Sequence, residues 1–416
     1  MRIFKFGGAS VKDAKGVKNV VKVLEQVGHD QTLIVISAMG KSTNALETVV
    51  NNYFENKKEL KGAINELKKF HDEILIELFE NEKHPVFGKI KILFEELQGF
   101  LSWNKSPNYS FVYDQVVCYG ELISTTILSE YLTSTGIKNT WLDVRDFIKT
   151  DANYRDAGVD WESTQTAISK GVNKAHLNIT QGFLGSDGNN FTTTLGREGS
   201  DYTAAIFAYC LNANSVTIWK DVPGVLNADP RHFVDTQLLN QISYEEAIEL
   251  AFYGASVIHP KTLQPLQRKE IPLFVKSFLN PTDTGTRVSK GHRLEPTVPC
   301  FIVKKSQVLL SLSALDFSFM VEENISEVFH LLHEYKMKVD VIQNSAISFS
   351  VCIDNKFNRL PELLAHLKAR FKVNCHENVS LYTIRHFNDK AVQSLEKGKD
   401  ILLKQLSQET MQMVVA

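Results

Sequence analysis

Short apolar strands alternate with helical patterns over the first two-thirds of the chain, and this alternation limits the fold more than any other feature. The run TLIVISAM (32–39) is almost entirely apolar, as strands buried on both faces of a parallel sheet are. Before it, Val17, Val20, Val21 and Leu24 recur at helical spacing within residues 14–27,. The pattern predicts an α/β fold, with a mainly parallel sheet covered by helices on both faces.

The same pattern continues to about residue 285. Residues 45–135 read as mostly helical, and Ile123, Ile127, Leu128 and Tyr131 form an inward stripe within YGELISTTILSEYL,. Further strands are predicted at KNTWLDV (138–144), LNITQGFLG (177–185), SVTIWKDV (215–222) and IPLFVKSF (271–278),.

The alternation of apolar strands and helices ends after Gly285. Residues 285–299 are polar and without periodicity, which predicts an irregular linker,. Two βαβ-type units of similar size follow, which suggests a repeat, and the second stops at Ala416 directly after a strand,. We therefore expect this second unit to lack a closing helix and strand. With 416 residues the chain is expected to hold at least two domains,.

Composition excludes several classes of protein. A formal charge of −2 provides no basic field for nucleic acid or anionic lipid,. The chain opens without the apolar core of a signal peptide, and no apolar run reaches membrane-spanning length,. Five scattered cysteines show no metal-binding spacing,. We expect a cytoplasmic protein with reduced cysteines.

The first candidate site is RIFKFGGAS (2–10). Glycines after a strand let backbone N–H groups approach a phosphate, and Lys5 adds a compact positive charge beside Gly7 and Gly8,. The alternative is a tight turn with Ser10 capping the next helix. The Walker A pattern GxxxxGK[ST] occurs nowhere in the chain.

The second candidate is TTLGREGSDYTAAIFAY (193–209). Arg197 suits a carboxylate, and the start of the following helix, at Ser200 and Asp201, suits a phosphate,. The alternative is that one of these two residues simply caps the helix.

A third candidate is the turn-rich loop that follows the strand in TIWKDVPGVLNADPR (217–231),. A plain surface loop is the alternative there. Glu121, directly after Gly120, is a lesser candidate, which a first-turn glutamate favoured by the helix dipole would also explain,.

Together these stretches resemble the aspartate kinases of the amino-acid kinase family. The resemblance is carried by KFGGAS (5–10), ISAMGKSTN (36–44), GELIST (120–125), TLGREGSDYTAA (194–205), WKDVPGVLNADPR (219–231) and YGASVIHPKT (253–262). It implies a three-layer αβα kinase domain at 1–285, followed by ACT modules, ferredoxin-like βαββαβ units, at 300–376 and, truncated, at 377–416. It also implies a monofunctional enzyme that phosphorylates L-aspartate with ATP and Mg²⁺, without a dedicated metal site, and that forms a homodimer through the ACT modules.

The resemblance also implies roles for single residues. On the substrate side, Ser37 and Thr43 would line the aspartate pocket with Ser200, Glu121 would bind the ammonium group and Arg197 the α-carboxylate. On the nucleotide side, Lys5 would neutralise the transferring phosphate, with Asp201 orienting it. The other nucleotide contacts implied are Gly7, Gly8, Lys220, Asp221 and Arg231.

The chain departs from the family pattern at several positions. Ser256 stands where a lysine usually reaches the phosphates, so Lys261 or Lys220 is expected to replace it, and Leu226 stands where the nucleotide loop commonly has tyrosine.

In the first ACT module, Val339, Asp340 and Ser345 match positions that often bind an amino-acid effector. The usual glycine-aromatic helix start is here Glu323-Asn324, and Ala346 replaces an acidic residue. Weak or absent feedback inhibition is therefore expected.

Two other functions stay open. A degraded kinase fold acting as a non-catalytic amino-acid sensor is favoured by Ser256 and disfavoured by the joint presence of Lys5, Arg197, Ser200 and Asp201. A kinase of glutamate or acetylglutamate is the nearer alternative, although Glu121, placed for a free ammonium group, disfavours an N-acylated substrate.

Overall fold

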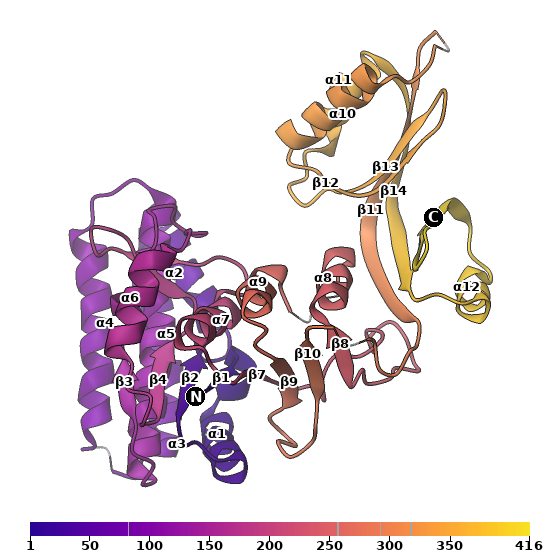
Figure 1. Cartoon of the computed structure of the whole chain (residues 1–416). Helices are drawn as coiled ribbons and strands as arrows, with labels where there is room; N and C mark the ends of the chain where they lie inside the picture. The colour runs from indigo at the N-terminus through magenta and orange to yellow at the C-terminus, as the bar shows by residue number, and fades with distance from the viewer. Residues whose placement is uncertain (82, 256–257, 292, 317) are drawn as a thin grey trace. The chain divides into compact units, whose positions relative to one another are not determined.

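The computed structural model describes residues 1–81, 83–255, 258–291, 293–316 and 318–416 (Figure 1). The chain forms two compact units. The first comprises residues 1–225, 238–248 and 258–293, and the second comprises residues 226–237, 249–257 and 294–416.

The first unit is built on an eight-stranded sheet in the order β3-β4-β2-β1-β7-β9-β10-β8. Neighbouring strands are parallel except β9 and β10. The strands are β1 Arg2–Phe6, β2 Thr32–Ile36, β3 Thr140–Leu142, β4 Asn178–Gln181, β7 Ser215–Lys220, β8 Gln241–Ser243, β9 Leu273–Ser277 and β10 Thr286–Ser289, with a separate hairpin of β5 Leu184–Ser186 and β6 Thr192–Thr194.

Helices cover both faces of this sheet. Phe4 and Phe6 of β1 point into a core shared with α1 to α5, whereas Lys5 lies on the opposite face, where α7 packs against β1 and β7. The helices are α1 Ala14–Val27, α2 Ser42–Glu55, α3 Lys57–Leu78, α4 Pro85–Trp103, α5 Tyr109–Ser134, α6 Trp161–Gly171, α7 Gly199–Leu211, α8 Tyr244–Tyr253 and α9 Pro260–Arg268. The predicted three-layer α/β fold is confirmed.

The predicted linker at 285–299 is wrong at its start, because β10 belongs to the first sheet. Thr286 pairs with Val275 of β9, and Val288 is fully buried. The polar Thr286 is tolerated inside because its hydroxyl accepts from the Val225 N–H (2.8 Å) and donates to the Leu239 carbonyl (2.5 Å). Buried threonine and serine made the strand look like a loop.

The second unit contains a six-stranded antiparallel sheet in the order β12-β13-β11-β14-β16-β15. Its elements are β11 Cys300–Ala314, α10 Glu322–Glu334, β12 Lys338–Asn344, β13 Phe349–Asp354, α11 Leu360–Lys368, β14 Phe371–Arg385, α12 Asp389–Glu396, β15 Ile401–Leu406 and β16 Thr410–Val415.

Strands β11 and β14 run through both halves of this sheet. The last residues of β11 pair with β13 and with the start of β14, whereas residues 300–304 pair with residues 381–385. A register shift between Lys304 and Gln307 separates the two parts. Residues 300–304, at the start of the segment 300–376, thus supply a strand to the half of the sheet formed by 377–416.

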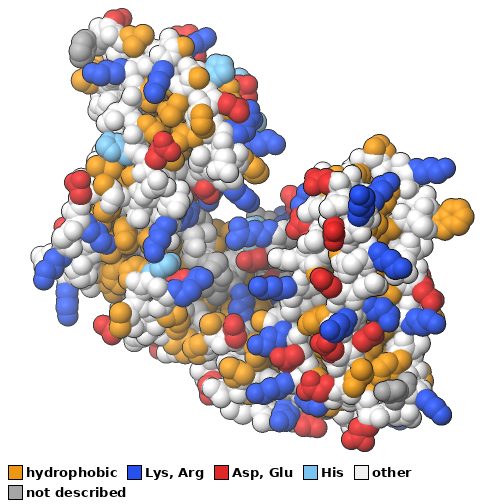
Figure 2. Space-filling model, turned by 180° about the vertical axis from the view of Figure 1, so that it is seen from behind, with side chains coloured by type: hydrophobic (Ala, Val, Ile, Leu, Met, Phe, Trp, Pro, Cys, Tyr) orange, Lys and Arg blue, Asp and Glu red, His pale blue; other side chains and the backbone are white. Residues whose placement is uncertain are grey.

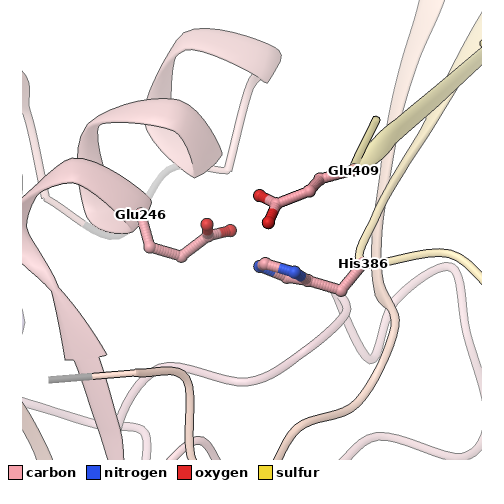
Figure 3. A group of neighbouring side chains, drawn as sticks. All are labelled: Glu246, His386 and Glu409. Atoms are coloured by element: carbon pink, nitrogen blue, oxygen red, sulfur yellow. The ribbon is translucent and has the colours of Figure 1, made fainter. Parts of the chain in front are cut away.

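One buried cluster extends across the second sheet. It includes Val341 on edge strand β12 and Leu403 on the opposite edge strand β15. The pairing of β14 with β16 ends where the His386 N–H donates to the Glu409 carbonyl (2.7 Å), and Figure 3 draws these two side chains at the ends of their strands. Figure 3 also draws Glu246, which belongs to the first unit.

Charges of both signs are interspersed on the face shown in Figure 2, in keeping with the net charge of −2. Within the described ranges, none of the helices has the length and apolar character needed to cross a membrane.

Candidate active site

A cavity of about 410 Å³ opens at the carboxyl edge of the first sheet. Residues within two positions of the ends of five neighbouring parallel strands line it: Gly7 after β1, Ser37 after β2, Phe183 after β4, Asp221 after β7 and Phe278 after β9. Ligands of open α/β sheets bind at this edge because the strand ends and the following loops converge there.

Lys5 and Asp201 form a close ion pair inside the cavity. Their Nζ and Oδ1 atoms lie 2.6 Å apart, and the side chains are only 11% and 5% exposed. Gly7 leaves room for the ammonium group, since a Cβ there would lie 3.3 Å from Lys5 Nζ. Asp201 thus fixes the position of the Lys5 ammonium group near the end of β1.

Gly8 brings two loops together. A Cβ at this position would lie 2.7 Å from the Ala38 carbonyl oxygen and 2.9 Å from that of Gly40, and the Gly40 N–H donates to the Gly8 carbonyl (3.0 Å). Only glycine allows this approach of the β1 loop to the β2 loop. The alternative role of Gly7-Gly8, a tight turn after the strand, is compatible with this arrangement. The cap of α1 is Asp13, however, and not Ser10.

The start of α7 forms another wall. Glu198 is its N-terminal flanking residue, with φ +55°, so Ser200 and Asp201 lie in the first turn and neither caps the helix. The capping alternative is therefore excluded for both. Gly182 permits the close approach of β4, since a Cβ there would lie 2.4 Å from Ser200 Cβ. The positive end of the helix dipole faces this region.

Glu121 is almost fully buried in the cavity wall. It lies in the middle of α5, which excludes the alternative of a first-turn glutamate. Burial raises the pKa of its carboxyl to about 8, although an N–H donated by Ala38 and the charge of Lys5 both act to lower it. Oε2 has no hydrogen-bond partner among the described residues. A buried carboxyl with an open oxygen suits a ligand cation.

The cavity brings most of the sequence-predicted site residues together. Its lining includes Lys5, Gly7, Gly8, Ser37, Thr43, Glu121, Ser200, Asp201, Lys220 and Asp221.

Three predicted residues lie elsewhere. Arg197 is exposed beside the lining residues Gly196 and Glu198. Lys261 is not among the residues that line the cavity, and its Nζ atom lies 3.0 Å from Asp156 Oδ1. Arg231 belongs to the second unit, where its hydrogen bonds lower the pKa of Asp229 to about 2. Ser256 lies outside the described residues.

Sequence reasoning missed several lining residues. Phe183, Trp219 and Phe278 each lie at or just after the carboxyl end of a strand, a position that could have marked them. The Trp219 ring stacks on Phe6, with ring centres 5.9 Å apart. Glu198 and Gly196 also line the cavity and were not predicted, because the prediction at this segment rested on the positive charge of their neighbour Arg197.

The family model for the amino acid kinase family matches residues 1–277. The chain therefore belongs to the amino acid kinase family. Over 398 residues it is 30% identical to lysine-sensitive aspartokinase 3 of Escherichia coli (strain K12), covering 92% of this chain and 86% of that protein. Within the family the chain thus falls among the aspartokinases.

Other relatives agree with this placement. A chloroplastic bifunctional aspartokinase/homoserine dehydrogenase of Arabidopsis thaliana is 27% identical, and the match covers 89% of this chain but only 42% of that longer protein. Among solved structures, E. coli aspartokinase III in complex with lysine and aspartate superposes with a TM-score of 0.84 at 28% identity, over 100% of this chain and 96% of that one. The same enzyme in complex with aspartate and ADP gives a TM-score of 0.81, with the same identity and coverage. The amino-acid kinase fold with C-terminal ACT modules is thus confirmed.

Proposed function

We propose that this protein transfers the γ-phosphoryl group of ATP to the β-carboxylate of L-aspartate, giving 4-phospho-L-aspartate and ADP, the first step towards lysine, threonine and methionine. The observation that carries the proposal is the cavity in which the Lys5–Asp201 ion pair lies with the buried Glu121. The similarity to an E. coli enzyme whose solved complex contains aspartate and ADP supports it.

The nucleotide half of the cavity provides charge neutralisation. Lys5, oriented by Asp201, contacts the transferring phosphoryl group, and the Gly7 and Gly8 backbone approaches it closely. Phosphoryl transfer depends on positioning and on stabilising charge. The attacking β-carboxylate is already ionised at neutral pH, so no general base is required. Lys220 and Asp221 contact the nucleotide from the end of β7.

The substrate half recognises a free amino acid. Glu121 binds the ammonium group and Arg197 the α-carboxylate, while Ser37, Thr43 and Ser200 line the same cavity as Glu121. This assignment leaves the β-carboxylate directed at the phosphoryl group. Two fixed charges set the orientation of aspartate, which is how enzymes convert binding energy into a reactive geometry.

Magnesium fits the same cavity. Mg²⁺ takes oxygen ligands and usually shares them with substrate phosphates. Glu198 has a buried Oε2 without a hydrogen-bond partner among the described residues, and Asp221 lines the cavity beside Lys220. These two carboxylates would hold the ion with the ATP phosphates, and the ion would neutralise phosphate charge during transfer.

A hydroxylamine-trapping assay tests the function. The protein is incubated with ATP, MgCl₂ and hydroxylamine together with aspartate, glutamate or N-acetylglutamate. We expect the hydroxamate only with aspartate. A product with glutamate or N-acetylglutamate alone would give the kinase another substrate, and no product with any acid, together with aspartate binding by calorimetry, would support the sensor alternative.

Arg197→Lys should raise mainly the KM for aspartate and leave the KM for ATP nearly unchanged. A guanidinium group can grip a carboxylate through two parallel hydrogen bonds, which one ammonium group cannot reproduce. Initial rates at varied aspartate and ATP measure both constants, with Arg287→Lys, an exposed position on β10, as the control. A rise confined to the KM for ATP would move Arg197 to the nucleotide side.

Millimolar lysine or threonine should inhibit the activity little. Asp340, one of the expected effector residues, is buried and already pairs with Lys304 (2.8 Å) and Lys338 (3.3 Å) in the second unit. Ser345, which directly follows β12, hydrogen-bonds to Ser348 (2.7 Å) within its own hairpin, and Val339 lies near the other end of that strand. Rates measured across an effector titration check this, and steep inhibition below 1 mM would show that other residues form an effector pocket.

We also propose a homodimer formed through the ACT modules in the cytoplasm. Edge strands β12 and β15 are available for pairing, since unpaired strand edges favour association,. Large apolar side chains are exposed in the first module, at Phe319, Val321, Phe329, Ile342 and Ile347. Light scattering at micromolar concentration should give a dimer mass, and a single monomeric species would contradict the proposal. We propose a kinase domain that runs from residue 1 through β10, which ends at Ser289, and ACT modules at 300–376 and 377–416, with residues 300–304 pairing with the second module.

A further inference from the structure

The segment Thr194–Glu198, which carries Arg197 from β6 to α7, is held by a buried carboxylate outside the cavity. Asp114 of α5 is fully buried. Its Oδ2 accepts from the Thr194 N–H (2.9 Å) and from the Arg155 N–H (3.0 Å), and its Oδ1 accepts from the Thr194 hydroxyl (2.8 Å). Three donors thus converge on one side chain at the residue where the Arg197 segment begins.

Lys261 holds the same segment one residue further on. Its ammonium group donates to the Leu195 carbonyl (3.1 Å) and to Asp156 Oδ1 (3.0 Å), and it lies over the Tyr202 ring at 5.1 Å from the ring centre. Lys261 is the residue that was expected to replace the phosphate-binding lysine of the family, where this chain has Ser256. Its ammonium group is engaged by these contacts instead.

Residues 155–157 pack along the Arg197 segment. The Ala157 N–H donates to the Thr194 carbonyl (2.9 Å). Gly196 has φ +77°, and a Cβ there would lie 2.5 Å from Asp156 Oδ1. The loop at 155–157, Asp114 and Lys261 therefore enclose the segment before it reaches Arg197.

The segment needs this support because its backbone is unusual. Glu198 adopts φ +55° without being glycine, a conformation that surrounding contacts must maintain,. An exposed arginine on an unsupported loop would have to be ordered each time a substrate bound, which weakens binding.

We propose that Asp114 and Lys261 are positioning residues that fix the Thr194–Glu198 segment and thereby set the affinity of the Arg197 subsite for the substrate α-carboxylate. The inference rests on the proposed function, since it assigns Arg197 to aspartate. It moves Lys261 from the nucleotide side to the substrate side and gives Asp114 a role in substrate recognition.

The test compares variants that remove single hydrogen bonds. We expect Thr194→Val and Asp114→Asn to raise the KM for aspartate about tenfold, as expected for losing a hydrogen bond to a charged group, and to leave the KM for ATP unchanged. Thr194→Ser retains the hydroxyl and should keep the wild-type KM for aspartate. Thr164→Val is the matched control, because it removes another fully buried hydroxyl that bonds to the Lys149 backbone.

An Arg197→Ala background makes the test specific. If Asp114 and Thr194 act through Arg197, adding Thr194→Val to Arg197→Ala should not raise the KM for aspartate further. Lys261→Met should behave as Thr194→Val does. If Asp114→Asn does not fold, the Thr194→Val and Thr194→Ser pair decides the matter.

The outcomes separate the two proposals. An active wild type in which Thr194→Val leaves the KM for aspartate unchanged, raises the KM for ATP equally or adds fully to Arg197→Ala would overturn the inference alone. A wild type that forms no ADP with aspartate would overturn the proposed function, and the inference with it.

Discussion

Lys5→Ala should reduce aspartate-dependent turnover by about 10²–10³-fold, because removing one preorganised charge from a transferring group costs about 3–4 kcal/mol of transition-state stabilisation. Lys5 is fixed in the cavity by Asp201 at 2.6 Å, so its charge needs no reorganisation during the reaction. Steady-state rates at saturating ATP and aspartate measure the loss. Lys22→Ala, on the exposed side of α1, is the control.

Loss of folding has to be separated from loss of chemistry. Lys5→Ala leaves Asp201 as a buried charge without its partner, which is destabilising,. The double variant Lys5→Ala/Asp201→Asn removes both charges, so thermal unfolding should return towards the wild-type temperature while activity stays lost. Near-normal turnover of a folded Lys5→Ala protein would show that the assignment of Lys5 is wrong.

Glu121→Gln should raise the KM for aspartate by about 10²-fold, because an amide cannot neutralise an ammonium group in a buried site. In the wild type, burial raises the pKa of Glu121 to about 8. The carboxyl of the free enzyme is therefore mostly protonated at pH 7, and binding the substrate ammonium requires its ionised form. It follows that kcat/KM for aspartate rises as the pH increases from 6 through about 8 and then levels off,.

Initial rates between pH 6 and 9 check the direction of this pH dependence. The increase with pH should be present in kcat/KM for aspartate, absent from kcat/KM for ATP and lost in Glu121→Gln. Calorimetry at pH 7 in buffers of different ionisation enthalpy should show a proton released when aspartate binds. A flat profile for aspartate in the wild type would remove Glu121 from the ammonium site.

Much of the candidate site could be predicted from the sequence because it follows from one rule of the fold. Residues after parallel strands converge at one edge, so Gly7, Ser37 and Asp221, far apart in the chain, meet in one cavity,. The apolar run of β2 predicts a buried strand, and the helical spacing of apolar residues in α1 predicts a helix that packs on the sheet,.

The rest depends on long-range packing that no local pattern encodes. Lys261 forms an ion pair with Asp156, 105 residues away in the sequence, and no pattern near either residue predicts this contact. Asp114 reads as one polar residue in an apolar helix until Thr194 and Arg155 are brought against it. Residues 300–304 are assigned by the sequence to the first ACT module, because nothing local indicates that their partner strand, at 381–385, follows a whole intervening module.

That pairing also fixes where this chain can be cut and recombined. Because residues 300–304 complete the half of the sheet formed with β14, β15 and β16, a fragment beginning at 307 or at 377 would expose an unpaired strand,. A chimera that exchanges regulatory regions between aspartokinases must therefore transplant 300–416 as one continuous piece. A graft of either ACT module alone would divide a hydrogen-bonded ladder instead of a linker.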